Sequence, residues 1–155
     1  MLTISVDADA CPVKDEVYRV ARRYGLAVKV AANAPVRVPS DPLIELVVRQ
    51  GFGVVDDWIA EQAGAGDLVV TADVPLAARA LEKGARVLDH KGRAFTEADI
   101  GSALAMRDLM ADLRQAGEIT GGPAAMTPRD RSRFLSKLDE SANAILRAHP
   151  RPPQA

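Results

Sequence analysis

Five aspartates are the residues in this chain best suited to chemistry, because they stand where expected strands end or helices begin. They are Asp7, Asp9, Asp56, Asp57 and Asp73. In an open parallel sheet the carboxyl ends of the strands share one edge, where ligands bind. Carboxylates gathered there would repel one another unless a cation neutralised them. Oxygen ligands of this kind suit Mg²⁺ or Mn²⁺, so the pattern predicts a site for one or two divalent ions.

Helix capping is the competing interpretation for several of these acids. Aspartate is a favoured N-cap, and for Asp9, Asp56 or Asp73 taken alone, capping is the better explanation. Asp7 is harder to explain in this way, because a carboxylate directly after a buried strand needs a partner. The repetition of acids over several strand ends favours a site. Asp67, between Gly66 and Leu68, is expected to be a turn residue.

Three further polar residues are candidates for contacts with a phosphate at the same edge. Lys14 falls in the first turn of an expected helix, where the helix dipole disfavours a cation. A phosphate contact and a solvated surface lysine are both open for it. Asn33 and Arg37 lie in the proline-rich loop after the second expected strand, and they either reach this edge or are solvated.

Two other kinds of chemistry find little support. Cys11 precedes a helix, where a thiol of lowered pKa can act as a nucleophile. Neither His90 nor His149 is placed as its base, so a small buried cysteine is expected. The glycine clusters lack the spacing of a Walker loop or a dinucleotide fingerprint, so no nucleotide cofactor is expected.

The elements that would position these residues alternate between strand and helix. Strands are expected at 2–6, 26–31, 43–48, 67–71 and 87–88, and helices at about 12–24, 56–63 and 75–83. Gly25 is expected to end the first helix in a left-handed conformation. This alternation predicts a three-layer α/β domain with a mainly parallel five-stranded sheet and right-handed crossovers.

The last third of the chain is expected to be helical. One helix is predicted from Thr96 to about Gln115, and a final helix begins at 127–128 after a loop over 117–126. In the final helix Leu135, Leu138, Ala142 and Ile145 are predicted to face the core. These segments give one domain over 1–148, with the sheet and its crossover helices in 1–90 and a helical extension in 95–148. The tail at 149–155 is predicted to be disordered.

The composition sets limits on the kind of protein. A chain of 155 residues with 48% hydrophobic residues suits one domain with its own core. A single cysteine excludes an internal disulfide, and no signal peptide or run of about 20 apolar residues is recognisable, so a soluble cytoplasmic protein without a membrane span is expected. The net charge of −1 gives no overall field toward nucleic acid. It leaves room for a local basic patch, since most basic residues are arginines.

Several specific motifs make the chain recognisable. The run Asp-Ala-Asp-Ala-Cys-Pro-Val-Lys at 7–14, the run Gly-Asp-Leu-Val-Val-Thr-Ala-Asp-Val-Pro-Leu-Ala at 66–77 and Thr-Gly-Gly-Pro at 120–123 are the clearest. On these motifs, up to about residue 146, the chain resembles the YaiI/YqxD family of bacterial proteins. That family in turn is similar to the PIN-like, or NYN-like, nuclease superfamily.

The resemblance implies a function and roles for particular residues. It implies a PIN-like domain that hydrolyses phosphodiester bonds, in RNA, with Mg²⁺ or Mn²⁺. Asp7, Asp56 and Asp73 would be the catalytic acids that hold the metal, with Asp9 and Asp57 as further ligands, and Lys14, Asn33, Arg37 and Thr71 would contact the substrate. A non-catalytic module that binds nucleic acid or nucleotides, and a phosphatase on small phosphate esters, are the alternatives. Assembly into a homo-oligomer stays open.

The chain departs from the family pattern at two places. Where Gly-Phe-Asp is expected, it has Gly-Phe-Gly at 51–53, which removes one carboxylate. If that acid is a ligand in the family, this chain is impaired or uses Asp57 instead. After the fifth strand it has His-Lys-Gly at 90–92 in place of Pro-Arg-Gly, which keeps a cation but changes the loop.

Overall fold

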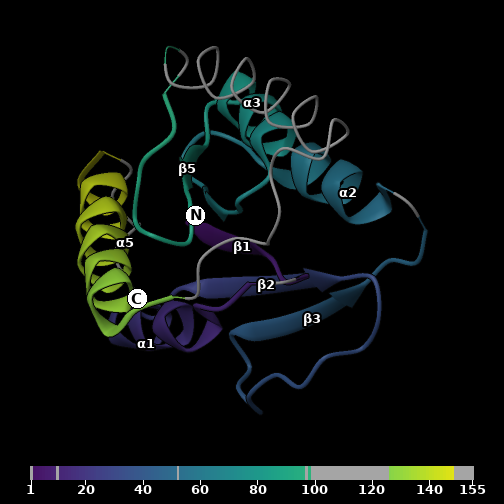
Figure 1. Ribbon diagram of the computed structural model, residues 1–155, viewed down its shortest axis with the longest axis horizontal. Helices are drawn as coiled ribbons and strands as arrows, with labels where there is room; N and C mark the ends of the chain where they lie inside the picture. Colours follow the sequence, from purple (N-terminus) through teal and green to yellow (C-terminus); the bar gives the residue numbers. More distant parts are fainter. Residues whose placement is uncertain (1, 10, 52, 97, 99–125, 149–155) are drawn as a thin grey trace, which may run out of the picture.

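A sheet of five strands lies between two pairs of helices (Figure 1). The computed structural model describes residues 2–9, 11–51, 53–96, 98 and 126–148. The elements in chain order are β1 (Thr3–Asp7), α1 (Lys14–Tyr24), β2 (Ala27–Ala32), β3 (Ile44–Val48), α2 (Val54–Gln62), β4 (Leu68–Val70), α3 (Val74–Glu82), β5 (Arg86–Leu88) and α5 (Pro128–Ala148).

The strand order is β3-β2-β1-β4-β5, and each neighbouring pair is parallel. The chain builds the sheet outward from β1, first through β2 and β3 on one side and then through β4 and β5 on the other. The order therefore reverses between β1 and β4, which is the position where open α/β sheets form a ligand crevice. The predicted parallel α/β sheet is confirmed.

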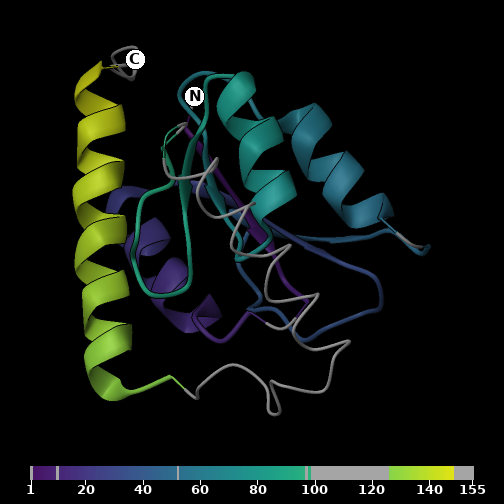
Figure 2. The same cartoon turned by 45° about the horizontal axis from the view of Figure 1, so that its top comes forward.

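The core has two parts, one on each face of the sheet (Figure 2). On one face, α1 and α5 pack over Ile4, Val6, Val28, Val30, Leu68 and Val70. On the other face, α2 and α3 pack over Ala31, Val47, Val69 and Val87. Side chains of a strand point alternately to the two faces, so a strand that is buried on both reads as a continuous apolar run.

The final helix closes the first of these two parts. Leu138, Ala142 and Ile145 are buried as predicted, but Phe134 fills the first position of the stripe and Leu135 is only half-buried. These positions recur at helical spacing, so one face of α5 carries the whole contact. The helix begins with a reciprocal cap, in which the N–H of Asp130 donates to Thr127 Oγ1 (3.1 Å) and the N–H of Thr127 donates to Asp130 Oδ2 (3.1 Å).

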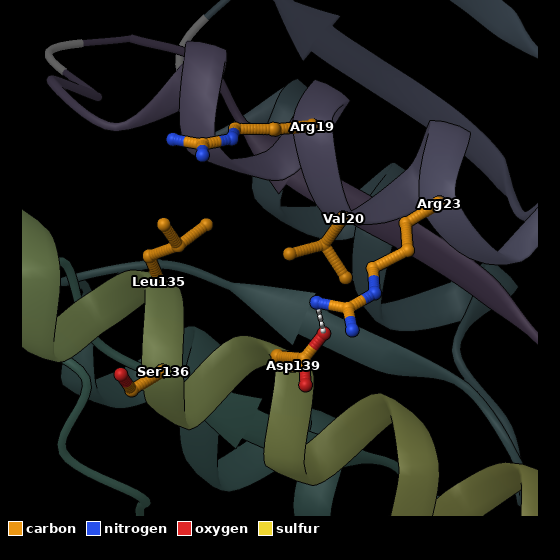
Figure 3. Close-up of a pocket in the computed structure, with 6 residues that line it drawn as sticks. All are labelled: Arg19, Val20, Arg23, Leu135, Ser136 and Asp139. Atoms are coloured by element: carbon orange, nitrogen blue, oxygen red, sulfur yellow. Dashed lines mark ion pairs between the residues drawn. The ribbon is translucent and has the colours of Figure 1, made fainter.

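Polar contacts also join α5 to α1. The Tyr24 hydroxyl donates to Asp139 Oδ1 (2.8 Å) and accepts from Asn143 Nδ2 (2.8 Å). Figure 3 shows Arg23 meeting Asp139 (3.4 Å) at the side of a hollow of about 230 Å³ between the two helices. These contacts fix how α5 lies against the sheet.

Two helix starts differ from the sequence prediction. Helix α1 begins at Lys14 rather than at residue 12. Helix α2 begins at Val54, two residues before Asp56, because Gly53 takes a left-handed conformation (φ 72°) and its carbonyl accepts from the N–H of Asp57 (3.0 Å). Gly25 ends α1 with φ 64°, as predicted.

Part of the prediction for the last third lies outside the described residues. This holds for the expected helix over 96–115, apart from its first residues, for the loop up to residue 125 and for the tail at 149–155. The division into a sheet part and a helical extension stays a prediction. Among the helices that the structure describes, none is long and apolar enough to span a membrane.

Candidate metal site at the carboxyl edge of the sheet

An acidic pocket opens at the point where the strand order reverses. Its volume is about 260 Å³, and it is lined by Asp7, Asp9, Asn33, Gly53, Val55, Asp56 and Asp73. These residues come from the ends of β1 and β2, the start of α2 and the turn between β4 and α3. Four of the five predicted aspartates thus meet in one pocket, and no lysine or arginine among the described residues lines it.

Asp7 is the most perturbed of these acids. It is the last residue of β1, and its Oδ2 accepts a hydrogen bond from the Thr71 hydroxyl (3.0 Å). Burial raises the pKa of Asp7 to about 6, against the opposing effect of the Thr71 hydrogen bond. The negative charges of Asp56, Asp9 and Asp73 contribute to this rise. The pocket therefore disfavours the Asp7 carboxylate unless a positive charge is present.

Thr71 connects Asp7 to the turn that holds Asp73. Its side chain is fully buried, and its hydroxyl accepts from the N–H of Asp73 (3.0 Å) while it donates to Asp7. The hydroxyl thus uses its proton and one lone pair within the protein. Thr71 stands behind Asp7 and not in the pocket lining, so its place fits a residue that orients Asp7 rather than one that contacts substrate.

Asp73 both caps a helix and lines the pocket. It is the N-cap of α3, and its Oδ1 accepts from the N–H of Leu76 (3.0 Å). The capping interpretation is therefore correct for Asp73. The cap occupies one carboxylate oxygen and fixes the side chain, and Asp73 still faces the other acids at the pocket.

The neighbouring acids on α2 face in different directions. Burial, together with the charges of Asp73 and Asp57, raises the pKa of Asp56, and Arg79 opposes this shift. Asp57 does not line the pocket; its exposed carboxylate pairs with Arg79 of α3 at 2.7 Å. Successive helical residues point about 100° apart, so only one of the two acids can face the pocket.

The two residues at the rim of the pocket are exposed. Asp9 Oδ2 accepts from the N–H of Asn33 at 3.3 Å, which ties the loop after β1 to the end of β2. Asp9 is not a helix cap, because α1 begins beyond it with Val13 as the N-cap. Lys14 is half-buried at the start of α1, Arg37 is exposed in the loop between β2 and β3, and neither lines the pocket.

Cys11 has the structural role expected from the sequence. It is buried, and burial raises the pKa of its thiol to about 11 despite the nearby charge of Lys14. A thiol with this pKa stays protonated at neutral pH and is a poor nucleophile.

The donors suit a hydrated divalent ion. As the side chains lie, no three His, Cys, Asp or Glu residues in the described part of the chain converge closely enough to hold a metal. Mg²⁺ commonly keeps several waters and uses only one or two carboxylates, so a wider arrangement of acids still fits it. Asp7, with its raised pKa and three acids around it, is the first candidate ligand; Asp56, Asp73 and Asp9 follow.

Sequence reasoning missed three residues of this region as participants. Gly53 and Val55 line the pocket, and Arg79 holds Asp57 away from it. For Gly53 the sequence did offer a signal, because this glycine stands where the family pattern has an aspartate. A Cβ built on Gly53 meets no described residue within 4 Å, so the described part of the chain leaves space there beside the pocket.

The parallel sheet with helices on both faces places the chain in the broad class of α/β proteins, in which ligands commonly bind at the strand ends. Within that class, the chain belongs to the family described as "Uncharacterized BCR, YaiI/YqxD family", which it matches over residues 5–144. The resemblance to this family is therefore confirmed.

The relatives cover nearly the whole chain. A UPF0178 protein of Rhodopseudomonas palustris (strain HaA2) is 58% identical over 151 residues, which is 97% of this chain and 92% of the relative. A UPF0178 protein of Parvibaculum lavamentivorans is 55% identical over 151 residues, which is 97% of this chain and 99% of the relative. A UPF0178 protein of Nitrobacter winogradskyi is 55% identical over 148 residues, with 95% and 94% covered. These names assign no activity.

Proposed function

We propose that this protein is a divalent-metal-dependent nuclease that hydrolyses phosphodiester bonds in RNA. The observation that carries the proposal is the environment of Asp7, a half-buried carboxylate at the reversal point of the sheet with three acids around it. A carboxylate whose pKa is raised by burial and by neighbouring acids is typical of a functional site, and a bound cation would offset both effects. The resemblance to PIN-like nucleases supports the same reaction class.

The residues of the acidic pocket would have different roles in this reaction. Asp7, Asp56 and Asp73 would hold Mg²⁺ or Mn²⁺, with Asp9 as a further ligand at the rim. When bound, the ion would supply Lewis acidity toward the phosphodiester and the attacking water. Thr71 would keep Asp7 in its orientation through the 3.0 Å hydrogen bond. The cap to Leu76 would keep Asp73 in place.

The rim of the pocket favours a polymer over a small ester. Asp9 and Asn33, which form part of this rim, are both exposed, so the acids lie at an open edge rather than in a closed chamber. A strand of RNA can lie across such an edge. A phosphatase for small esters would gain from a pocket that encloses the substrate.

One observation favours the alternative of a non-catalytic module that binds nucleic acid. No three potential metal ligands in the described residues converge on one point. Such a module would bind RNA without metal, and its affinity would fall with salt as counterions are released. It would not cleave.

A cleavage assay with matched variants tests the proposal. Labelled single-stranded RNA is incubated with wild type, Asp7→Asn, Asp73→Asn and Asp57→Asn, each with Mn²⁺ and with EDTA. We expect metal-dependent cleavage by wild type, a loss of 100-fold or more in the first two variants, on the order of 3 kcal/mol of activation free energy, and near-full activity in Asp57→Asn. Activity that persists in Asp7→Asn would refute the role of that residue.

The same proteins decide between the alternatives. Hydrolysis of p-nitrophenyl phosphate without RNA cleavage would identify a phosphatase. RNA binding in EDTA without any cleavage would identify a binding module. Calorimetry with Mn²⁺ on wild type and on the Asp7→Asn/Asp73→Asn double variant tests the ion itself. Equal binding by both proteins, or binding by neither, removes the metal from the proposal.

A further inference from the structure

A larger hollow lies between the segment after β5 and helix α5. Its volume is about 590 Å³, and five cations line it: Arg86, Lys91, Arg93, Arg133 and Lys137. All five side chains are exposed. We call this hollow the β5–α5 groove. Its excess of positive charge contrasts with the net charge of −1 of the whole chain.

Among the described residues two carboxylates line the groove, and they neutralise little of this charge. Asp89 Oδ1 accepts from the N–H groups of Lys91 (2.9 Å) and Arg93 (2.8 Å), so this carboxylate shapes its own loop. Glu140 pairs with Lys137 at 3.4 Å, and both side chains are more than half exposed. An exposed ion pair of this kind is weak, so a phosphate can compete with Glu140 for Lys137. Arg86 and Lys91 form no ion pair with any residue that the structure describes.

The loop that carries two of these cations is held firmly in place. After β5 the chain turns back along the outer edge of the strand, where Asp89 N–H donates to Arg93 O (2.9 Å) and Phe95 N–H donates to Val87 O (3.0 Å). Gly92 packs onto α5 so closely that a Cβ there would lie 2.9 Å from Arg133 O. The groove is therefore formed before any ligand binds, which lowers the entropy cost of binding.

The groove and the acidic pocket reach the same edge of the sheet. Its loop leaves the carboxyl end of β5, as Asp7 and the Asp73 turn leave the carboxyl ends of β1 and β4. β5 is the second strand from β1, and neighbouring strands lie about 4.8 Å apart, so the two strand ends are about 10 Å apart. A few nucleotides of one RNA strand are long enough to cover this distance.

We propose that the β5–α5 groove binds the sugar–phosphate backbone of RNA and leads the strand toward the acidic pocket. Three of its five cations are arginines, whose planar guanidinium groups suit phosphate oxygens. The choice of RNA as the polyanion rests on the proposed nuclease function. Binding in the groove needs neither metal nor cleavage, so it can be measured separately.

The test is the anisotropy of a labelled 20-nucleotide single-stranded RNA in EDTA, measured over a series of salt concentrations. The double variant Arg86→Ala/Lys91→Ala removes two exposed groove cations. Arg19→Ala/Arg22→Ala removes two exposed cations from α1, outside the groove, and is the control with the same change of charge. Thermal melts of both variants show that the fold is intact.

We expect the groove variant to bind RNA at least 10-fold more weakly and the control to bind within about twofold of wild type. The slope of log affinity against log salt should fall by about 1.4 in the groove variant, since each lost contact with a single strand removes about 0.7. Equal weakening in both variants, or tighter binding of inorganic polyphosphate than of RNA, would overturn the inference. Absence of cleavage with Mn²⁺ would sink the nuclease proposal but leave this result unaffected.

Discussion

At the scale of single residues, Asp7 makes the metal-free protein sensitive to pH. Its pKa is about 6 in the folded protein against 3.8 in the unfolded chain. Between these values the folded state binds more protons, so stability falls as the pH rises toward 6 and the whole penalty is present above it. Asp7→Asn removes the penalty and keeps an oxygen for the Thr71 hydroxyl. We expect it to raise Tm by a few degrees at pH 7.5 in EDTA.

The control for this prediction is a pH series on the same proteins. Well below pH 3.8 Asp7 is protonated in both states, so the advantage of Asp7→Asn should vanish there. Glu61→Gln, an exposed acid on α2, should leave Tm unchanged at both pH values. A variant Asp7→Asn that is less stable than wild type at pH 7.5 would show that the Asp7 carboxylate is not strained.

Gly53 marks the position where a further carboxylate can enter the pocket. The described residues leave the space around its Cβ open, and of the L residues Asp and Asn tolerate a φ of 72° best. We expect Gly53→Asp to bind Mn²⁺ about 10-fold more tightly than wild type by calorimetry, because it adds an oxygen ligand beside Asp56. Its stability in EDTA should fall by ~1 kcal/mol from the left-handed backbone, with added repulsion from Asp56.

Gly53→Asn separates the two effects of this substitution. It has the same backbone strain and nearly the same shape as Gly53→Asp, but no negative charge. Its affinity for Mn²⁺ should stay close to that of wild type. If the Asp and Asn variants bind Mn²⁺ equally, residue 53 does not contribute a ligand.

At the scale of elements, one buried hydroxyl joins β1 to the β4–α3 turn. Thr71→Val keeps the shape of the side chain but leaves Asp7 Oδ2 and the Asp73 N–H without this partner. We expect a loss of about 1–3 kcal/mol in urea unfolding, together with weaker Mn²⁺ binding. Thr71→Ser keeps the hydroxyl and should retain most of the affinity. An unchanged affinity in Thr71→Val would mean that Asp7 needs no orientation by β4.

Another contact between elements depends on Gly92. A Cβ at this position would lie 2.9 Å from Arg133 O and 3.0 Å from Phe134 Cα, at a φ of 84°. Gly92→Ala must therefore push the loop after β5 away from α5, at a cost of about 1–3 kcal/mol. We expect the RNA affinity of the β5–α5 groove to fall as well. Gly64→Ala, whose Cβ would meet among the described residues only Asp67 Oδ2, at 3.9 Å, is the control and should change neither quantity.

The same scale shows what sequence patterns can and cannot predict. Strand positions followed from short apolar runs bounded by glycine and proline, and the final helix from Leu138, Ala142 and Ile145 at helical spacing. The start of α2 could not be placed, because Asp56 resembles a cap while Gly53 begins the helix. Helix starts are uncertain by one or two residues for this reason.

The uncertain start of α2 also limited the prediction of the site. With the start of α2 unplaced, its rotation about its own axis was unknown, and the pattern could not show that Asp57 turns toward Arg79. An acid at the end of a strand, such as Asp7, could be placed at the sheet edge from the sequence, because its position does not depend on how a helix is rotated. Thr71 was singled out, but its burial behind Asp7 depends on the pairing of β1 with β4.

At the scale of the whole molecule, one sheet separates two apolar layers that carry different tasks. The layer with α2 and α3 supports the acidic pocket, and the layer with α1 and α5 supports the β5–α5 groove. Negative and positive charges are thereby kept apart along one edge. Under the proposed function, a polyanion would bind through the cations without approaching the acids until a metal ion neutralised them.

A core variant can test whether the two apolar layers unfold as one cooperative unit. Leu138 of α5 is fully buried in the layer with α1, whereas Trp58, the single tryptophan, lies on α2 across the sheet between Lys29 and Arg49. Leu138→Ala should cost about 2–5 kcal/mol. In urea, Trp58 fluorescence and far-UV circular dichroism should report this loss equally. Ser136→Ala, exposed on the same helix, should change neither. A Trp58 transition that stays in place while the helical signal shifts would show that α5 unfolds separately and that the groove and the pocket are independent.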